Sequence, residues 1–176
     1  MAGSQVSKGG AKESRLVQLA VRALQDALRR LRLERYDVDK AYAPTGETLF
    51  WLGSCDEGLQ DLLGDRYRAA RQGDPEGQLI AGIRWARNRM THQRAIVIQR
   101  NHGSELGTWI LGQGRLGTRD EMYWAPADGV PADPRYDRGR DVYEDQLAGQ
   151  PVIPTAEATV RWIQKAASQV GLDSTP

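Results

Sequence analysis

Apolar residues recur at three- and four-residue intervals from Ser14 onward, and this spacing predicts a long amphipathic helix. The hydroxyl of Ser14 suits the N-cap of that helix. A stripe of this kind either covers a hydrophobic core or forms the seam of a dimer, and the pattern leaves both open. The apolar positions are Leu16, Val17, Ala20, Ala23, Leu24, Ala27, Leu28 and Leu31.

A break follows at residues 37–47, DVDKAYAPTGE, because proline and glycine are poor helix formers. A second helix is expected to begin at Thr45 or Gly46 and to run to Leu63. The residues 71–77, RQGDPEG, predict a turn after it.

Asp74 and Pro75 predict the start of a third helix, because aspartate is a good N-cap and proline is tolerated at the first helical position. Its apolar positions lead into the run AIVI at 95–98, so the helix is expected to extend to about Arg100. Residues 101–103, Asn-His-Gly, then form its C-terminal stop.

The segment 105–141 is rich in glycine and proline and carries two tryptophans. Its short apolar runs at 108–111 and 122–124 predict a β-hairpin. Residues 141–149 are expected to form a short helix, and Thr155 is expected to cap a last helix over 156–171.

These elements predict an all-α fold, a mainly helical bundle with an irregular or small β-hairpin insertion in the C-terminal half. We expect one α-helical domain over residues 14–170, with 105–141 as the insertion. The polar ends, 1–13 and 171–176, are expected to be a disordered N-terminal tail and a C-terminal tail.

Composition narrows the class of protein. The 176 residues fit one domain, and with Cys55 as the sole cysteine no intrachain disulfide can form. The N-terminal residues lack the apolar stretch of a secretory signal, and no apolar run reaches the roughly 20 residues of a membrane span. These features predict a cytoplasmic protein without membrane association, and no metal or cofactor motif is recognisable.

Charge is uneven along the chain, although the formal net charge is only +1. No Asp or Glu lies between Glu76 and Glu105, a stretch that contains five arginines. Arginine suits bidentate phosphate contacts, although coding bias also produces an excess of arginine. The five residues are Arg84, Arg87, Arg89, Arg94 and Arg100.

One motif in this basic stretch carries candidate chemistry. Asn88 and His92 are four residues apart on the predicted third helix and share a face, whereas Arg87 and His92 are about 140° apart around the axis. The long side chain of Arg87 can still lean toward His92. The alternative is that all three are ordinary polar residues of a helix.

The stretch Arg87-Asn88-Arg89-Met90-Thr91-His92 resembles the Arg–polar–x–x–x–His signature of HEPN domains (higher eukaryotes and prokaryotes nucleotide-binding). The resemblance implies an all-helical fold, a homodimer, and a metal-independent endoribonuclease of toxin–antitoxin or phage-defence systems. It implies catalytic roles for Arg87, His92 and Asn88. One variant of the family carries a modifiable tyrosine two residues after the histidine, and this chain has Arg94 there.

The chemistry of these residue types fits metal-free RNA cleavage. Histidine side chains, with a reference pKa of about 6.5, transfer protons near neutral pH, and arginine stays charged beside a phosphorane. One histidine cannot easily serve both sides of a phosphate, so a two-fold dimer that pairs two sites is expected. Arg84, Arg89 and Arg94 are expected to bind the RNA backbone.

Two other classes of function stay open. The chain is alternatively a non-catalytic helical module that binds RNA, a nucleotide or a protein such as an antitoxin. It is alternatively a structural or assembly protein, in which case the apolar residues around Trp109 and Trp124 are expected to be exposed in the isolated monomer. Asp56 and Glu57 are expected on a helix surface, and Cys55 is expected to be buried.

Overall fold

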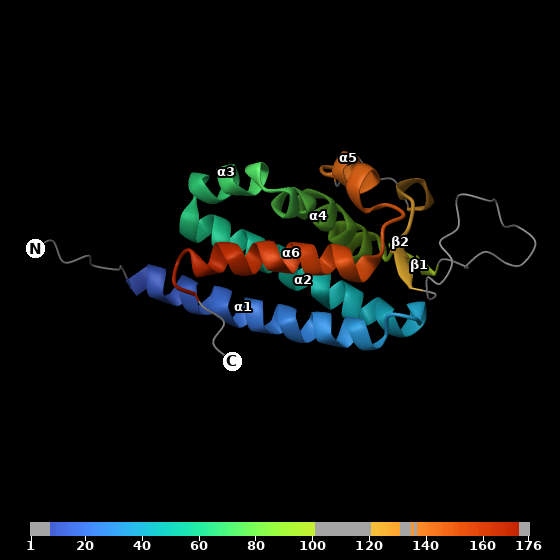
Figure 1. The fold of residues 1–176 in the computed structure, drawn as a ribbon, viewed down its shortest axis with the longest axis horizontal. Coiled ribbons are helices and arrows are strands. Elements are labelled where there is room, and N and C mark those ends of the chain that lie inside the picture. The colour runs from blue at the N-terminus through green and yellow to red at the C-terminus, as the bar shows by residue number, and fades with distance from the viewer. Residues whose placement is uncertain (1–7, 101–120, 131–134, 136, 173–176) are drawn as a thin grey trace, which may run out of the picture.

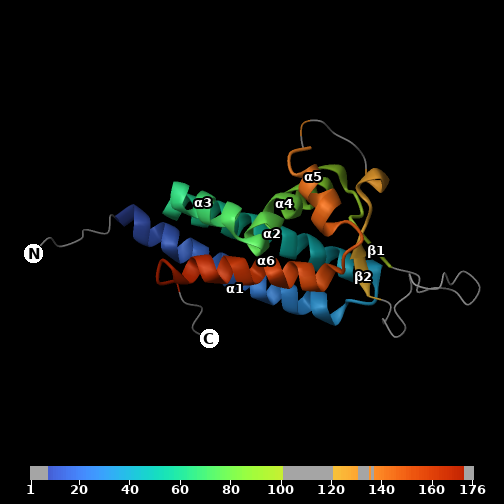
Figure 2. The ribbon, with the colours of Figure 1, turned by 45° about the horizontal axis from the view of Figure 1, so that its top comes forward.

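The computed structural model describes residues 8–100, 121–130, 135 and 137–172, with side chains from residue 11 onward. Four long helices form a bundle: α1 (Lys8–Leu33), α2 (Val38–Leu63), α4 (Pro75–Gln93) and α6 (Val152–Ser168). Helix α2 contacts the other three, and in both views α4 lies on the opposite side of α2 from α1 (Figures 1 and 2). The prediction of an all-α bundle is confirmed.

The small β element is a two-stranded antiparallel ribbon of β1 (Ile98–Arg100) and β2 (Met122–Trp124). It lies at the end of the bundle where α1 ends and α2 begins (Figure 1). Strand β2 is the predicted strand 122–124, but its described partner is β1, with Ile98 opposite Trp124. The other predicted partner, 108–111, lies outside the described residues.

The hydrophobic core lies between the four long helices. Large side chains fill it, and those that are less than 2% exposed include Leu24, Leu49, Leu59, Ile80, Trp85 and Trp162. The apolar stripe predicted for the first helix is therefore mostly core, with Val17, Leu24 and Leu28 buried. Leu16 of the stripe is an exception, because about half of its side chain is exposed.

Helix α2 begins at Val38, seven residues before the earlier predicted start, so the expected break at 37–47 is wrong from Val38 onward. The Asp37 side chain caps the helix by accepting a hydrogen bond from the Lys40 N–H at 3.1 Å. Pro44 then lies inside the helix. Buried residues on both sides of Pro44, among them Ala41 and Leu49, stabilise the helix against the cost of the missing N–H.

A short helix, α3 (Asp65–Gly73), was not predicted. It follows Gly64, whose φ of 60° reverses the chain direction between α2 and α3. Helix α3 returns along the bundle and contacts both α2 and α4. Asp74 and Pro75 then start α4 as predicted, with the Asp74 carboxylate accepting from the Glu76 N–H at 2.9 Å.

Helix α4 ends at Gln93, so the prediction that it extends to about Arg100 is wrong. Arg94 takes the left-handed conformation (φ 53°, ψ 31°), and its N–H donates to the Arg89 carbonyl. The next residues, Ile96, Val97 and Ile98, are β-branched and favour an extended backbone. The predicted stop at 101–103 lies outside the described residues.

The C-terminal part matches its predicted helices closely. A turn of α-helix, α5 (Arg140–Val142), continues into a π-helical turn at Tyr143–Leu147, which covers α4. Helix α6 begins at Val152 rather than after Thr155, whose hydroxyl donates to the Pro151 carbonyl at 2.8 Å instead of capping the helix. Within the described ranges, no helix is both long enough and apolar enough to span a membrane.

Candidate nucleic-acid interface on helix α4

The three motif residues lie in the C-terminal half of α4, at different depths. The Arg87 side chain is 20% exposed, Asn88 is half-buried, and His92 is exposed in the last turn. The Thr91 hydroxyl donates to the Arg87 carbonyl at 2.8 Å. Both ionisable groups of the motif are therefore at the protein surface.

Arg87 lies across α2 at Gly53. A Cβ atom at Gly53 would be 2.1 Å from Arg87 Nη1, a distance that real Cβ contacts essentially never show, and a tight 3.0 Å from Cζ. The glycine therefore creates the space in which the guanidinium rests. Gly46, two turns earlier on α2, has no such role, because a Cβ there would meet the Met90 methyl group at an ordinary 3.6 Å.

Glu57 holds the same guanidinium from the next turn of α2. Its Oε1 atom is 3.4 Å from Arg87 Nη1 and 3.1 Å from Arg84 Nη2. The Glu57 side chain is half exposed, so water and salt screen both ion pairs. Residues 77–104 contain no Asp or Glu, but the fold brings Glu57 of α2 next to two of their arginines.

Asp56 is buried, and the prediction that it lies on a helix surface is wrong. Its carboxylate accepts from Arg71 Nη1 at 2.8 and 3.0 Å, from Arg84 Nη1 at 2.8 Å and from the Tyr67 hydroxyl at 2.8 Å. The Trp162 N–H donates in turn to the Tyr67 oxygen at 3.2 Å. Helix α3 covers the carboxylate and supplies two of these donors, Tyr67 and Arg71. Because the sequence did not predict α3, it did not predict that Asp56 is buried.

Arg89 is inside the protein, with only 1% of its side chain exposed. Its guanidinium pairs with Asp137, donates to Gln93 Oε1 at 3.0 Å and lies 4.8 Å from the centre of the Trp85 ring. Asp137 comes from the segment 105–141 and so ties that segment to α4. In this arrangement Arg89 stabilises the fold and does not reach the surface.

The remaining arginines predicted to bind RNA are at the surface. Arg84 is 36% exposed and shared between Asp56 and Glu57, while Arg94 is exposed at the end of α4. The structure therefore brings Arg84, Arg87 and Glu57 together on one edge of α2 and α4. We call these three residues, with Gly53, the α2–α4 edge.

Sequence reasoning missed Gly53, Asp56, Glu57 and Asp137 as partners of the arginines. Asp56 did carry a signal, because it falls between Leu52, Cys55 and Leu59 at the spacing of a buried helix face. An acid at such a position needs a cationic partner, and the nearby arginine-rich stretch supplies one. Gly53 and Asp137 had no comparable signal, since their contacts depend on tertiary packing.

The buried ionisable groups near this edge are poor candidates for chemistry. Burial raises the pKa of the Cys55 thiol to about 12, so Cys55 is protonated at neutral pH. Burial and the nearby Asp56 charge also raise the pKa of Tyr67. Among the residues whose positions are described, no three His, Cys, Asp or Glu side chains group as metal ligands.

The tryptophans are mainly core residues. Trp85, Trp124 and Trp162 are each 2% exposed or less, and the Trp124 and Tyr143 rings pack edge to face with centroids 6.3 Å apart. Trp124 is therefore buried, whereas the assembly-protein alternative predicts an exposed apolar surface around it. Trp109 lies outside the described residues, and Trp51 is half-buried.

Comparison of the chain with protein-family models, with characterised proteins and with solved structures finds no match.

Proposed function

We propose that the protein is a metal-independent endoribonuclease that acts as a homodimer, with Arg87, Asn88 and His92 of both chains at a composite site. The observation that carries the proposal is that Arg87 and His92, five residues apart on α4, both lie at the protein surface. A polyanion from solvent can therefore reach a fixed positive charge and a proton-transfer group on one helix end.

The proposed reaction forms a bond between the ribose 2′-oxygen and the phosphorus and breaks the bond from phosphorus to the 5′-oxygen. One His92 accepts the proton of the 2′-hydroxyl, and the partner copy's His92 donates a proton to the leaving 5′-oxygen. Arg87 stabilises the additional negative charge of the phosphorane. Asn88 binds a phosphate oxygen or orients His92, and Arg84 and Arg94 bind flanking phosphates.

Glu57 makes this proposal more specific. A phosphate that binds Arg87 has to replace a carboxylate only 3.4 Å from the guanidinium. The Glu57 side chain of this pair is 50% exposed and the Arg87 side chain is 20% exposed, so water can hydrate the carboxylate when the pair separates. The arginine is thus pre-positioned by Gly53 and Glu57 without being permanently neutralised.

The test is cleavage of single-stranded RNA by the purified full chain in EDTA, with product ends analysed for 2′,3′-cyclic phosphate and 5′-hydroxyl groups. We expect His92→Ala and Arg87→Ala each to lower the rate by at least about 100-fold, with unchanged thermal unfolding. His102→Ala is the matched control for loss of a histidine. Cleavage by His92→Ala as fast as by the wild type contradicts the proposal.

A non-catalytic RNA-binding module is the second candidate. The ion pairs of Arg84 and Arg87 with Glu57 favour it, because they weaken the positive field that catalysis on a polyanion needs. This candidate predicts salt-sensitive RNA binding that His92→Ala leaves unchanged and Arg84→Ala weakens. A toxin or defence role depends on the first candidate, and it predicts growth arrest on expression of the wild type but not of His92→Ala.

A further inference from the structure

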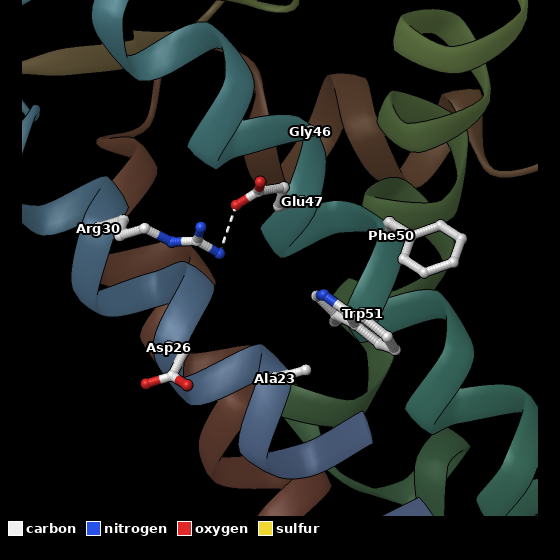
Figure 3. Close-up of a pocket in the computed structure, with 7 residues that line it drawn as sticks. All are labelled: Ala23, Asp26, Arg30, Gly46, Glu47, Phe50 and Trp51. Carbon is white, nitrogen blue, oxygen red and sulfur yellow. Dashed lines mark ion pairs between the residues drawn. The ribbon is translucent and has the colours of Figure 1, made fainter. Parts of the chain in front are cut away.

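A hollow of about 570 Å³ lies between α1 and α2, beside the α2–α4 edge. Its size is within the range of about 300–1,000 Å³ that is usual for ligand sites. Phe50 and Trp51 form its aromatic wall, with ring centroids 5.0 Å apart and planes at 78° (Figure 3). The nitrogen edge of Trp51 faces α1 in this view.

Charged side chains complete the hollow without giving it a large net charge. Arg30 of α1 and Glu47 of α2 form an ion pair across it at 2.6 Å (Figure 3). Asp26, one turn before Arg30, lies 3.0 Å from Arg29 and keeps 65% of its side chain exposed. The hollow thus offers an aromatic surface, the Arg30 guanidinium paired with Glu47, and the exposed Asp26 carboxylate, one oxygen of which accepts from Arg29.

Phe50 connects this hollow to the α2–α4 edge. Gly46, Phe50, Gly53 and Glu57 are spaced by four, three and four residues, so they form a single stripe along α2. Gly53 and Glu57 of that stripe contact Arg87, and Phe50 is about 4.5 Å along the helix axis from Gly53. The Phe50 side chain is 48% exposed although it is large and apolar.

We infer that the hollow binds an unpaired nucleobase of an RNA whose backbone phosphates lie on the α2–α4 edge. The inference rests on the proposed function for the class of ligand. Stacking on exposed aromatic rings is how proteins hold unpaired bases, and Phe50 is about one helical turn along α2 from Gly53, which contacts Arg87. A single-stranded nucleic acid satisfies the aromatic wall and the arginines together, whereas an apolar peptide satisfies only the wall.

Asp26 gives the hollow a preference among bases. A carboxylate accepts hydrogen bonds and donates none at neutral pH, so it pairs with an exocyclic amino group. Cytosine carries such a group and uracil carries a carbonyl in its place. The hollow therefore favours cytosine over uracil, two bases of almost the same shape.

The experiment measures binding of the full chain to 2′-O-methyl oligonucleotides, which cannot be cleaved because the attacking hydroxyl is blocked. Fluorescence anisotropy compares oligo-C, oligo-U and an abasic oligomer of the same length. We expect the wild type to bind oligo-C about threefold more tightly than oligo-U, and Asp26→Ala to remove that difference. Phe50→Ala is expected to weaken both by about tenfold, Phe50→Tyr to bind normally, and the abasic oligomer to bind weakly to every variant.

Leu19→Ala is the matched control, because Leu19 is an equally exposed apolar residue of α1 that does not line the hollow. If Arg87→Ala weakens binding and Phe50→Ala does not, the inference is overturned and the proposed function stands. If binding depends on Phe50 but the protein cleaves no RNA, the inference stands and the proposed function is overturned. A Phe50→Ala variant that loses a dimer but keeps its RNA affinity assigns the hollow to a second copy of the chain and overturns the inference.

Discussion

Asp56 and Glu57 are consecutive residues of α2, yet they belong to two different regions of the molecule. Asp56 lies inside, where α2, α3 and α4 meet, and four hydrogen bonds from three side chains satisfy its carboxylate. Glu57 lies on the α2–α4 edge, where its half-exposed carboxylate forms ion pairs with Arg84 and Arg87 and also contacts solvent. The same type of charge pair therefore stabilises the fold in one region and stays available for exchange in the other.

The difference follows from the cost of leaving a charge without a partner. In the interior an unpaired carboxylate or guanidinium loses its hydration and is strongly destabilising. At the edge water replaces the lost partner, so the pair contributes little to stability. Arg89 is itself buried and Arg71 pairs with a buried carboxylate, so both are structural. Arg87 is no more exposed than Arg71, but its partner Glu57 is half exposed, so this ion pair can separate at lower cost.

The largest expected effect comes from removing the interior acid. Asp56→Ala leaves the Tyr67 hydroxyl and the guanidinium groups of Arg71 and Arg84 without their shared acceptor, and we expect the free energy of unfolding to fall by about 3–5 kcal/mol. Urea denaturation at pH 7 measures it. Glu57→Ala is the matched control and should change stability by less than about 1 kcal/mol. Equal losses from the two variants would remove the distinction between the regions.

The second largest expected effect is at the α2–α4 edge, where a substitution should slow RNA cleavage without lowering stability. Gly53→Ala introduces a methyl group where Arg87 now lies, so the guanidinium has to move. We expect RNA cleavage to slow by about tenfold to 100-fold, since a displacement of about 1 Å is enough for such a loss. Chemical unfolding should show little loss of stability, because alanine favours a helix over glycine by up to about 1 kcal/mol.

Gly73→Ala is the control for this variant, because it makes the same change at the end of α3, where an added Cβ atom meets nothing within 4 Å. It should cleave RNA like the wild type. Gly53→Ala with full activity would mean that the position of Arg87 in the structure has no part in the reaction.

Asp74 is an intermediate case, with 19% of its side chain exposed at the start of α4. The Lys165 ammonium, 2.7 Å away, and the N–H groups of Glu76 and Gly77 lower the pKa of this carboxyl. Its contribution to stability is therefore complete above the unfolded-state pKa of about 4 and is lost as the pH falls through the lower folded-state pKa.

We expect Asp74→Ala to reduce the free energy of unfolding by about 1 kcal/mol at pH 7, the usual loss for an N-cap. The gap to the wild type should narrow as the pH is lowered from about 5 toward 2. Asp65→Ala is the control, because the Asp65 side chain is 91% exposed and its removal should have little effect at any pH. A gap that widens in acid would show that Asp74 does not act as the charged cap.

The smallest expected effect concerns the exposed acid. Glu57→Gln removes the negative charge beside Arg84 and Arg87, so RNA should bind a few-fold more tightly and with a steeper dependence on salt. Stability should change by less than about 1 kcal/mol. RNA-binding titrations between about 50 and 200 mM salt measure the affinity and its salt dependence for the wild type and the variant. A Glu57→Gln protein with weaker RNA binding would identify Glu57 as a residue that only positions Arg87.

Helices with a strong local signal could be predicted from the sequence. The periodic apolar residues of α1, the Asp74–Pro75 start of α4 and the last helix from residue 156 onward all depend on neighbours within a few residues. The same reasoning failed at Pro44 and at residues 94–100, where the outcome depends on contacts from elsewhere in the chain. Packing around Ala41 and Leu49 keeps α2 helical through its proline, and pairing with β2 makes a strand of residues 98–100.

The sequence by itself determined that this chain folds as helices around an apolar core and that one helix carries a cluster of arginines with a single histidine near its end. Only the tertiary structure decided what each arginine does, because it brings Asp56, Glu57 and Asp137 from other segments to Arg84, Arg87 and Arg89. The physical reason is that the role of a charged side chain depends on its burial and on its ion-pair partners, which lie far away in the sequence. The periodicity of one helix contains no information about either.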